Sequence, residues 1–199
     1  MSIGIFCLEN FWGKSVRDQS TIQPVLDLLQ KQKMGDYLYH RCATRAELEF
    51  MLTRWRAKTN VAKSPILYFA FHGSKDAISV GNEHISLGEI ATHLEGKCKG
   101  AVVFFDACET MKSDERNLKR FLITTGANAV LGYQCDVDWM KATAFGLLVL
   151  HALLPNRRKT TKDFEKLKDN LRMDSGQLYT DLQFRIVQHP ELPERLSKK

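Results

Sequence analysis

The chain has 199 residues, of which 44% are hydrophobic and 26% are charged, and its formal net charge is +6. This length fits a single domain with a sizeable core, and the composition excludes a disordered chain. The apolar run at residues 142–154 contains polar residues and stops at Pro155, so the sequence predicts no membrane span.

Short apolar runs alternate with amphipathic segments along the chain. Buried strands are predicted at residues 2–8, 37–42, 66–71, 101–105 and 127–133, with a small hairpin at residues 77–87. Helices are predicted at residues 21–33, 45–58, 87–94, 115–125, 141–154, 162–173 and 175–187. This alternation predicts a mostly parallel sheet covered on both faces. We therefore expect an α/β fold, a three-layer α/β/α sandwich, in one domain spanning residues 1–199, with C-terminal helices in residues 160–190 packed on its core.

Two helix starts carry capping signals. Ser20 or Thr21 can cap the first helix, and Pro24 lies in its first turn, where a missing N–H costs nothing. Thr44 followed by Glu47 has the capping-box pattern at the start of the second helix.

Two of the predicted strands end in residues that can do chemistry. Strand 66–71 runs into His72 and Gly73, and strand 101–105 runs into Asp106, Ala107 and Cys108. Parallel neighbours would bring both ends to the sheet edge where open α/β proteins carry their sites. We interpret Cys108 as a nucleophile and His72 as its base. The backbone N–H groups of Gly73 and Cys108 can bind an oxyanion, because a residue without Cβ lets the backbone approach a substrate.

The other cysteines and histidines offer weaker candidates. Five cysteines without a CxxC pair argue against a disulfide framework or a zinc ribbon and favour reduced thiols. Cys135 also ends a strand and is a rival nucleophile, although no glycine-flanked histidine accompanies it. The histidine spacing predicts no metal site.

These motifs resemble the caspase-like cysteine proteases, the group (clan CD) of caspases, metacaspases, legumains, gingipains and separases, and the CHAT branch most closely. The resemblance covers residues 66–155 and rests on His72-Gly73, the hairpin and helix, Asp106-Ala107-Cys108-Glu109, Gly126-Ala127 to Gly132, and Val137-Asp138-Trp139. It implies a caspase-like fold and peptide hydrolysis through an acyl-enzyme, with Cys108 as nucleophile and His72 as base or acid. It implies no metal or cofactor, and a role in bacterial defence or programmed death.

The resemblance also bears on the substrate, which is a protein or peptide. Asp106 precedes Cys108 by two positions, so strand alternation directs both side chains to one face. In metacaspases an aspartate at the matching position lines the pocket for a basic P1 residue, because a carboxylate pairs with Arg or Lys. Asp136 and Asp138 follow a neighbouring strand and can reinforce that pocket. The alternative is that these aspartates only cap loops.

Other functions remain as alternatives. The same fold can serve as a catalytically silent binding module, a pseudoprotease. A nucleotide-binding domain is excluded because neither a Gly-x-Gly-x-x-Gly fingerprint nor a Walker motif is present. Four of the excess positive charges lie from Pro155 onward, but no nucleic-acid-binding motif accompanies them, so we interpret that segment as a solvated helical surface. We expect no signal peptide, a cytoplasmic location, and a separate activator protein.

Overall fold

A computed structural model describes residues 3–13, 15, 17–155 and 159–194. The strands are β1 (Ile5–Glu9), β2 (Tyr37–Arg41), β3 (Ile66–Ala70), β4 (His72–Ser74), β5 (Ala77–Val80), β6 (Glu83–Ser86), β7 (Val102–Asp106), β8 (Ala129–Tyr133) and β9 (Phe184–Gln188). The helices are α1 (Gln23–Lys31), α2 (Arg45–Trp55), α3 (Lys58–Lys63), α4 (Leu87–His93), α5 (Glu115–Thr125), α6 (Trp139–Leu153), α7 (Thr161–Ser175) and α8 (Gln177–Asp181).

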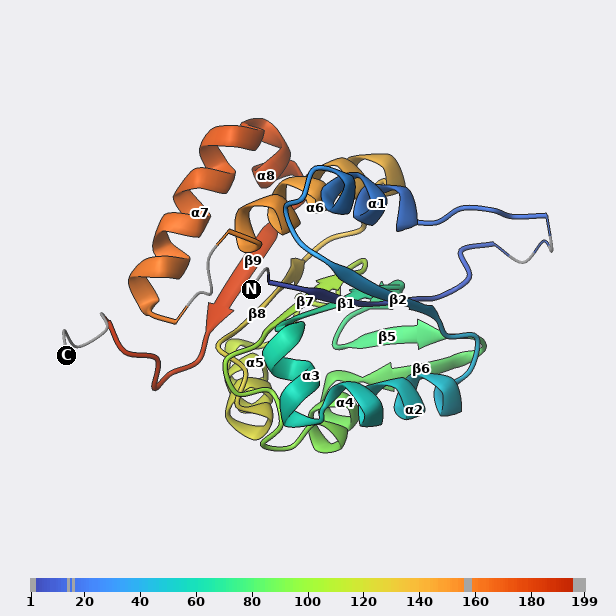
Figure 1. The fold of residues 1–199 in the computed structure, drawn as a ribbon, viewed down its shortest axis with the longest axis horizontal. Helices are drawn as coiled ribbons and strands as arrows, with labels where there is room; N and C mark the ends of the chain where they lie inside the picture. The colour runs from blue at the N-terminus through green and yellow to red at the C-terminus, as the bar shows by residue number, and fades with distance from the viewer. Residues whose placement is uncertain (1–2, 14, 16, 156–158, 195–199) are drawn as a thin grey trace.

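A mixed central sheet organises the described residues. Its six strands follow the order β2-β1-β3-β7-β8-β9, and neighbours are parallel except for β8 and β9. Helices α1, α6, α7 and α8 cover one face, and α2, α3, α4 and α5 cover the other (Figure 1). The predicted α/β class and mostly parallel sheet are confirmed, and the arrangement is compatible with a three-layer sandwich.

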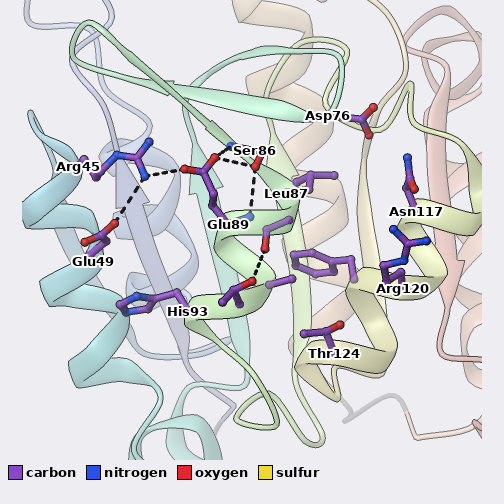
Figure 2. Close-up of a pocket in the computed structure, with 14 residues that line it drawn as sticks. Arg45, Glu49, Asp76, Ser86, Leu87, Glu89, His93, Asn117, Arg120 and Thr124 are labelled. Carbon is purple, nitrogen blue, oxygen red and sulfur yellow. Dashed lines mark hydrogen bonds and ion pairs between the residues drawn. The ribbon is translucent and has the colours of Figure 1, made fainter.

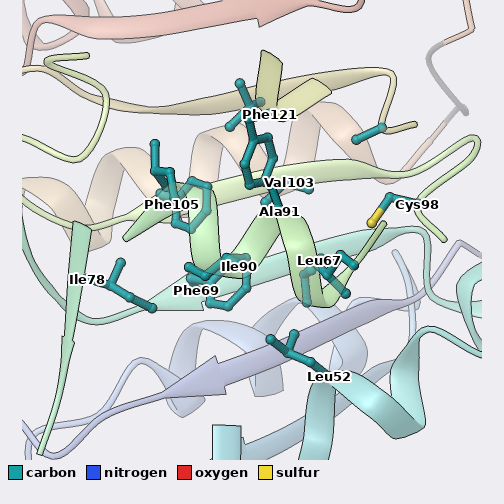
Figure 3. Packing of buried hydrophobic residues seen from close by; sticks show 14 of the residues in the cluster. Leu52, Leu67, Phe69, Ile78, Ile90, Ala91, Cys98, Val103, Phe105 and Phe121 are labelled. Atoms are coloured by element: carbon teal, nitrogen blue, oxygen red, sulfur yellow. The ribbon is translucent and has the colours of Figure 1, made fainter. Parts of the chain in front are cut away.

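The central strands are buried on both faces, as their sequences predicted. Alternate residues of β3 and β7 belong to opposite hydrophobic clusters, because successive side chains of a strand point to opposite faces. Phe69 and Phe105 stack with ring centroids 4.8 Å apart, and Phe121 of α5 meets Phe105 edge-on (Figure 3). Each buried aromatic side chain contributes roughly 1.5–3 kcal/mol. This packing fixes β3 and β7 side by side.

The predicted helix at residues 175–187 is wrong. Only α8 is helical there, and residues from Phe184 to Gln188 form the antiparallel edge strand β9. Gln183 turns the chain with a φ of 44°, after which Phe184 and Val187 are buried. Pairing with β8 satisfies backbone groups that β8 would otherwise expose at a sheet edge. The helix expected at residues 162–173 is confirmed as α7.

Helix caps follow the sequence fully in one case and in part in the other. The capping box of Thr44 and Glu47 is present at the start of α2. Helix α1, in contrast, has Ile22 as its N-cap residue, without a side-chain cap of its own. The Ile22 N–H instead donates to the carboxylate of Glu9, at 2.8 Å. Thr21 also contributes, since its Oγ1 accepts the Gln23 N–H at 3.1 Å, so a predicted residue and a carboxylate from a distant strand share the start of α1.

The predicted hairpin belongs to a small antiparallel sheet. Strands β5 and β6 form the hairpin, and β4, which contains His72, adds a third strand that the sequence analysis missed. Among the described residues, no helix is both long and apolar enough to cross a bilayer.

Candidate active site

The sheet register brings His72 and Cys108 to the same edge. Strands β3 and β7 are parallel, and Ala70 is opposite Asp106 at their carboxyl ends. Two residues beyond the end of β3 lies His72, and two residues beyond the end of β7 lies Cys108. Both side chains line one cavity of about 110 Å³. The structure therefore places the two residues along one cavity, at the sheet edge where the sequence predicted them.

Aromatic and small side chains enclose this cavity. It is lined by Trp12, Ile22, Phe71, His72, Asp106, Ala107, Cys108, Val137, Trp139, Ala142 and Thr143. Trp12 and Trp139 meet edge to face, with ring centroids 6.4 Å apart. The indole N–H of Trp139 is buried and finds no acceptor among the described residues. An unpaired buried donor of this kind can be satisfied by an acceptor on a bound ligand.

The imidazole of His72 is exposed and is oriented from the loop after β1. Its Nε2 lies 2.8 Å from the backbone carbonyl oxygen of Trp12. Because a carbonyl oxygen only accepts, Nε2 carries the proton, and Nδ1 is the ring nitrogen left to accept one. The Trp12 ring also meets the imidazole edge to face, at 5.2 Å between centroids. Sequence reasoning missed this contact because a backbone carbonyl has no residue signature.

The thiol of Cys108 is half-buried and accepts the backbone N–H of Val137, at 3.4 Å from Sγ. Burial raises the pKa of the Cys108 thiol, and the nearby carboxylates of Asp136 and Asp106 raise it further, against the opposing hydrogen bond from Val137. The resting residue is therefore a thiol at neutral pH. The sequence-based expectation that an imidazolium favours the thiolate is not supported in this state of the protein.

A tight turn holds the segment after Cys108. Glu109 adopts a φ of 53°, a left-handed conformation that non-glycine residues rarely take. Its N–H donates to the Cys135 carbonyl at 3.0 Å, and the Met111 N–H donates to Tyr133 at 2.9 Å. The guanidinium of Arg185 on β9 also donates to the carbonyl of Met111 at 3.2 Å. Strand β9 thus braces the loop that carries Cys108.

Gly73 packs directly against the same loop. A Cβ atom at this position would overlap the carbonyl oxygen of Cys108 and lie 2.5 Å from Thr110 Oγ1. Gly73 is therefore required for the close approach of β4 to Cys108. In the small sheet it pairs with Ile78 of β5.

Asp106 lines the same cavity as Cys108. Its carboxyl is buried and hydrogen-bonds the hydroxyl groups of Tyr68 and Tyr133. Burial raises the pKa of Asp106 to about 7, although the two tyrosine hydrogen bonds oppose that shift. At neutral pH the cavity therefore contains a carboxyl group that is easily protonated or paired with a cation.

The other two predicted aspartates lie outside the cavity lining. Asp138 is the N-cap of α6 and accepts the Lys141 N–H at 2.9 Å, so it has the capping role of the alternative interpretation. Asp136 is exposed and close enough to influence the Cys108 thiol electrostatically.

The remaining cysteines are placed away from His72. Cys135 is not among the residues that line the cavity, and its sulfur contacts the Asp181 carbonyl at 3.6 Å. Cys7, Cys42 and Cys98 are buried, and burial raises the pKa of each thiol, to about 12 for Cys42 and Cys98. The described residues contain no group of three His, Cys, Asp or Glu side chains arranged to hold a metal ion.

A larger groove of about 820 Å³ lies between α2, α4 and α5, away from both His72 and Cys108 (Figure 2). Some of its charged groups are paired, as Arg45 is with Glu89 at 2.8 Å. Two of its polar side chains are also engaged: Ser86 caps α4, and His93 hydrogen-bonds Thr53. The smaller cavity therefore carries the reactive groups despite its size.

Fold and site together define an α/β protein with a Cys/His pair at the carboxyl edge of its sheet. The chain belongs to the DUF6642 family, a family of unknown function, which it matches over residues 2–188. No curated protein matches the sequence.

Proposed function

We propose that the protein is a cytoplasmic cysteine endopeptidase of the caspase-like type, which cuts a protein partner. The observation that carries the proposal is that Cys108 lines the same cavity as a histidine whose Nε2 donates to a backbone carbonyl. Such an arrangement leaves the second ring nitrogen free to move protons, as a nucleophile and base pair requires. The parallel register of β3 and β7 supports the same assignment.

The chemistry follows from these positions. Cys108 Sγ attacks the scissile carbonyl carbon while His72 Nδ1 takes the thiol proton, so no preformed thiolate is needed. The backbone N–H groups of Cys108 and Gly73 stabilise the oxyanion. His72 then protonates the leaving amine, and a thioester remains on Cys108. Water, deprotonated by His72, hydrolyses that thioester and restores the thiol.

A basic residue at P1 fits the cavity. Asp106 supplies a buried carboxyl group to the cavity lining, and Trp12 and Trp139 supply aromatic side chains. A guanidinium or ammonium group is stabilised by both kinds of contact. The charge of such a side chain would also offset the cost of ionising a buried carboxyl.

A pseudoprotease is the second candidate, and one observation favours it. Burial and two carboxylates keep Cys108 protonated, so the thiol has little intrinsic reactivity at rest. The endopeptidase proposal accounts for the same observation through a separate activator protein that changes the environment of the thiol.

Cleavage of a complex peptide library, read by mass spectrometry of new termini, tests the proposal. We expect cleavage after Arg or Lys by wild type, and none by Cys108→Ala or His72→Ala. Cys135→Ala is the matched control and should cleave like wild type. Equal cleavage by wild type and Cys108→Ala, or no cleavage even with the native partner proteins added, would contradict it.

A further inference from the structure

We propose that Glu9 is a positioning residue for His72 and acts through Trp12. This inference rests on the proposed protease function for its kinetic consequence, but its structural content is independent of it. Glu9 ends β1, beside Ala70 in the sheet register, and its side chain is fully buried. A buried carboxylate is costly unless its lone pairs are filled.

The carboxylate of Glu9 is saturated by donors. Oε1 accepts the Trp12 indole N–H at 2.6 Å and the Ile22 N–H at 2.8 Å. Oε2 accepts the hydroxyl groups of Thr21 at 2.7 Å and Tyr39 at 2.5 Å. Two oxygens with about four acceptor sites are thereby fully used. One role of this network is structural, because it caps α1.

A second role follows from the position of Trp12. Its indole is held by Glu9, while its own backbone carbonyl accepts the Nε2 proton of His72 at 2.8 Å. Its ring also packs edge to face on the imidazole. One residue therefore joins the buried carboxylate to the exposed histidine.

The residues on either side of Trp12 also help to hold its carbonyl in place. The Gly13 N–H, which belongs to the same peptide unit as that carbonyl, hydrogen-bonds the Asp18 carboxylate. Phe11 is 48% exposed, and the guanidinium of Arg41 lies 4.9 Å from the centroid of its ring. Asn10 is tied to the sheet and to Ser79 by hydrogen bonds of 3.0 and 2.9 Å, but these contacts fix the chain before the turn. The bond from the indole to Glu9 acts together with the Gly13–Asp18 bond: it holds the Trp12 ring against the imidazole and so helps to place the carbonyl that orients His72.

The charge of Glu9 matters for this role because an amide cannot replace it. In Glu9→Gln, one oxygen becomes an NH₂ donor that faces other donors, so the network must rearrange. Trp12→Phe keeps the backbone carbonyl and an aromatic ring but deletes the indole N–H. If Glu9 acts through Trp12, the two substitutions remove the same connection, and their effects will not add.

The test combines a spectroscopic and a kinetic readout on the full chain. Nitrogen-15 NMR of labelled histidine reports whether neutral His72 carries its proton on Nε2. We expect wild type to show that tautomer, and Glu9→Gln and Trp12→Phe to show a mixture of tautomers. In peptide cleavage, each single variant should lose about tenfold or more in kcat with KM within about twofold, and the double variant should lose no more than the worse single.

Thr21→Val is the matched control, because it removes one hydrogen bond to Glu9 without touching the indole. It should retain the His72 spectrum of wild type. If Glu9→Gln fails to fold, as near-ultraviolet circular dichroism would show, Trp12→Phe decides the question alone. A folded Glu9→Gln or Trp12→Phe with wild-type tautomer and kcat would overturn the inference. Wild type that shows the Nε2 tautomer but no peptidase activity would overturn the proposed function instead.

Discussion

At the scale of single residues, the proposed binding of a basic P1 side chain by Asp106 predicts that substrate choice depends on pH. The pKa of Asp106 is raised to about 7, so the ionised fraction of this carboxyl increases through neutrality. The ratio of kcat/KM for an Arg substrate to that for a Leu substrate should rise about tenfold from pH 6 to pH 8, because titration of the reacting groups cancels in the ratio. In Asp106→Asn the ratio should fall by on the order of 30-fold and become independent of pH. A ratio that is flat with pH in wild type would contradict this assignment.

The same carboxyl should also cost stability. A raised folded pKa means that the stability contributed by protonated Asp106 is present at low pH and is lost as pH rises from the ordinary carboxyl pKa of 3.8 towards about 7. Asp106→Asn should therefore melt on the order of 4–8 °C higher than wild type at pH 8, with a smaller difference at pH 5. Calorimetry at the two pH values measures both shifts. A variant less stable than wild type at pH 8 would show that the charged form is stabilised in the fold.

Asp136 contributes to the high pKa of the Cys108 thiol through its negative charge, after the larger effect of burial. Asp136→Asn should therefore lower that pKa and speed alkylation of Cys108 by iodoacetamide severalfold at pH 8. Asp138→Asn is the control, since it keeps the cap of α6 and should alkylate like wild type. The rates are measured by intact mass and site mapping. Equal alkylation rates for all three proteins would show that Asp136 does not raise the pKa of the Cys108 thiol.

At the scale of elements, the contact of β4 with the Cys108 loop depends on a missing side chain. Gly73→Ala would force a Cβ against the Cys108 carbonyl and Thr110, and we expect a loss of about 1–3 kcal/mol in the free energy of unfolding. Alkylation of Cys108 should change with it, because the loop must move. Gly88→Ala, whose Cβ would lie 3.8 Å from Ser86 Oγ, should leave both measurements near wild type. Unchanged stability in Gly73→Ala would show that the Cys108 loop can move to make room for the Cβ atom without cost.

Strand β9 should control the order of the Cys108 loop through Arg185, which donates to the carbonyl of Met111 and, at 2.8 Å, to that of Ser113. Arg185→Met keeps much of the packing but removes these bonds. Hydrogen exchange of the Glu109 and Met111 amides should become about tenfold faster, with lower peptidase activity. Arg120→Met, in the groove of Figure 2, is the control. Unchanged exchange rates in Arg185→Met would mean that the turn is stable without the hydrogen bonds from Arg185.

The elements also show what the sequence could predict. Buried runs identified β3 and β7 as neighbours, and local patterns identified α5 and the cap at Thr44, because periodicity and capping are local. The strand β9 was mistaken for a helix, since its identity depends on pairing with a distant edge of β8. The candidate site could be proposed from the sequence because Cys108 and His72 have reactive side chains. The Trp12 carbonyl and the Glu9 network were missed because they depend on tertiary contacts.

At the scale of the whole molecule, the two helical layers and the sheet place one reactive edge at the carboxyl ends of β1, β3 and β7. Glu9, His72 and Cys108 all lie at or just beyond that edge, although they are far apart in the sequence. The protein thus presents an oriented histidine and a protonated thiol in one small cavity. We propose that these two groups form a catalytic pair.

Labelling by acyloxymethyl-ketone probes tests that claim most directly. Probes with Arg, Lys, Asp or Leu at P1 are incubated with wild type, Cys108→Ala, His72→Ala and Cys135→Ala, with native partner proteins added in a parallel series. Intact mass should show one adduct on wild type and Cys135→Ala, strongest for Arg and Lys, mapped to Cys108, and little on His72→Ala. No adduct under any condition, or an adduct that persists in Cys108→Ala, would contradict the account.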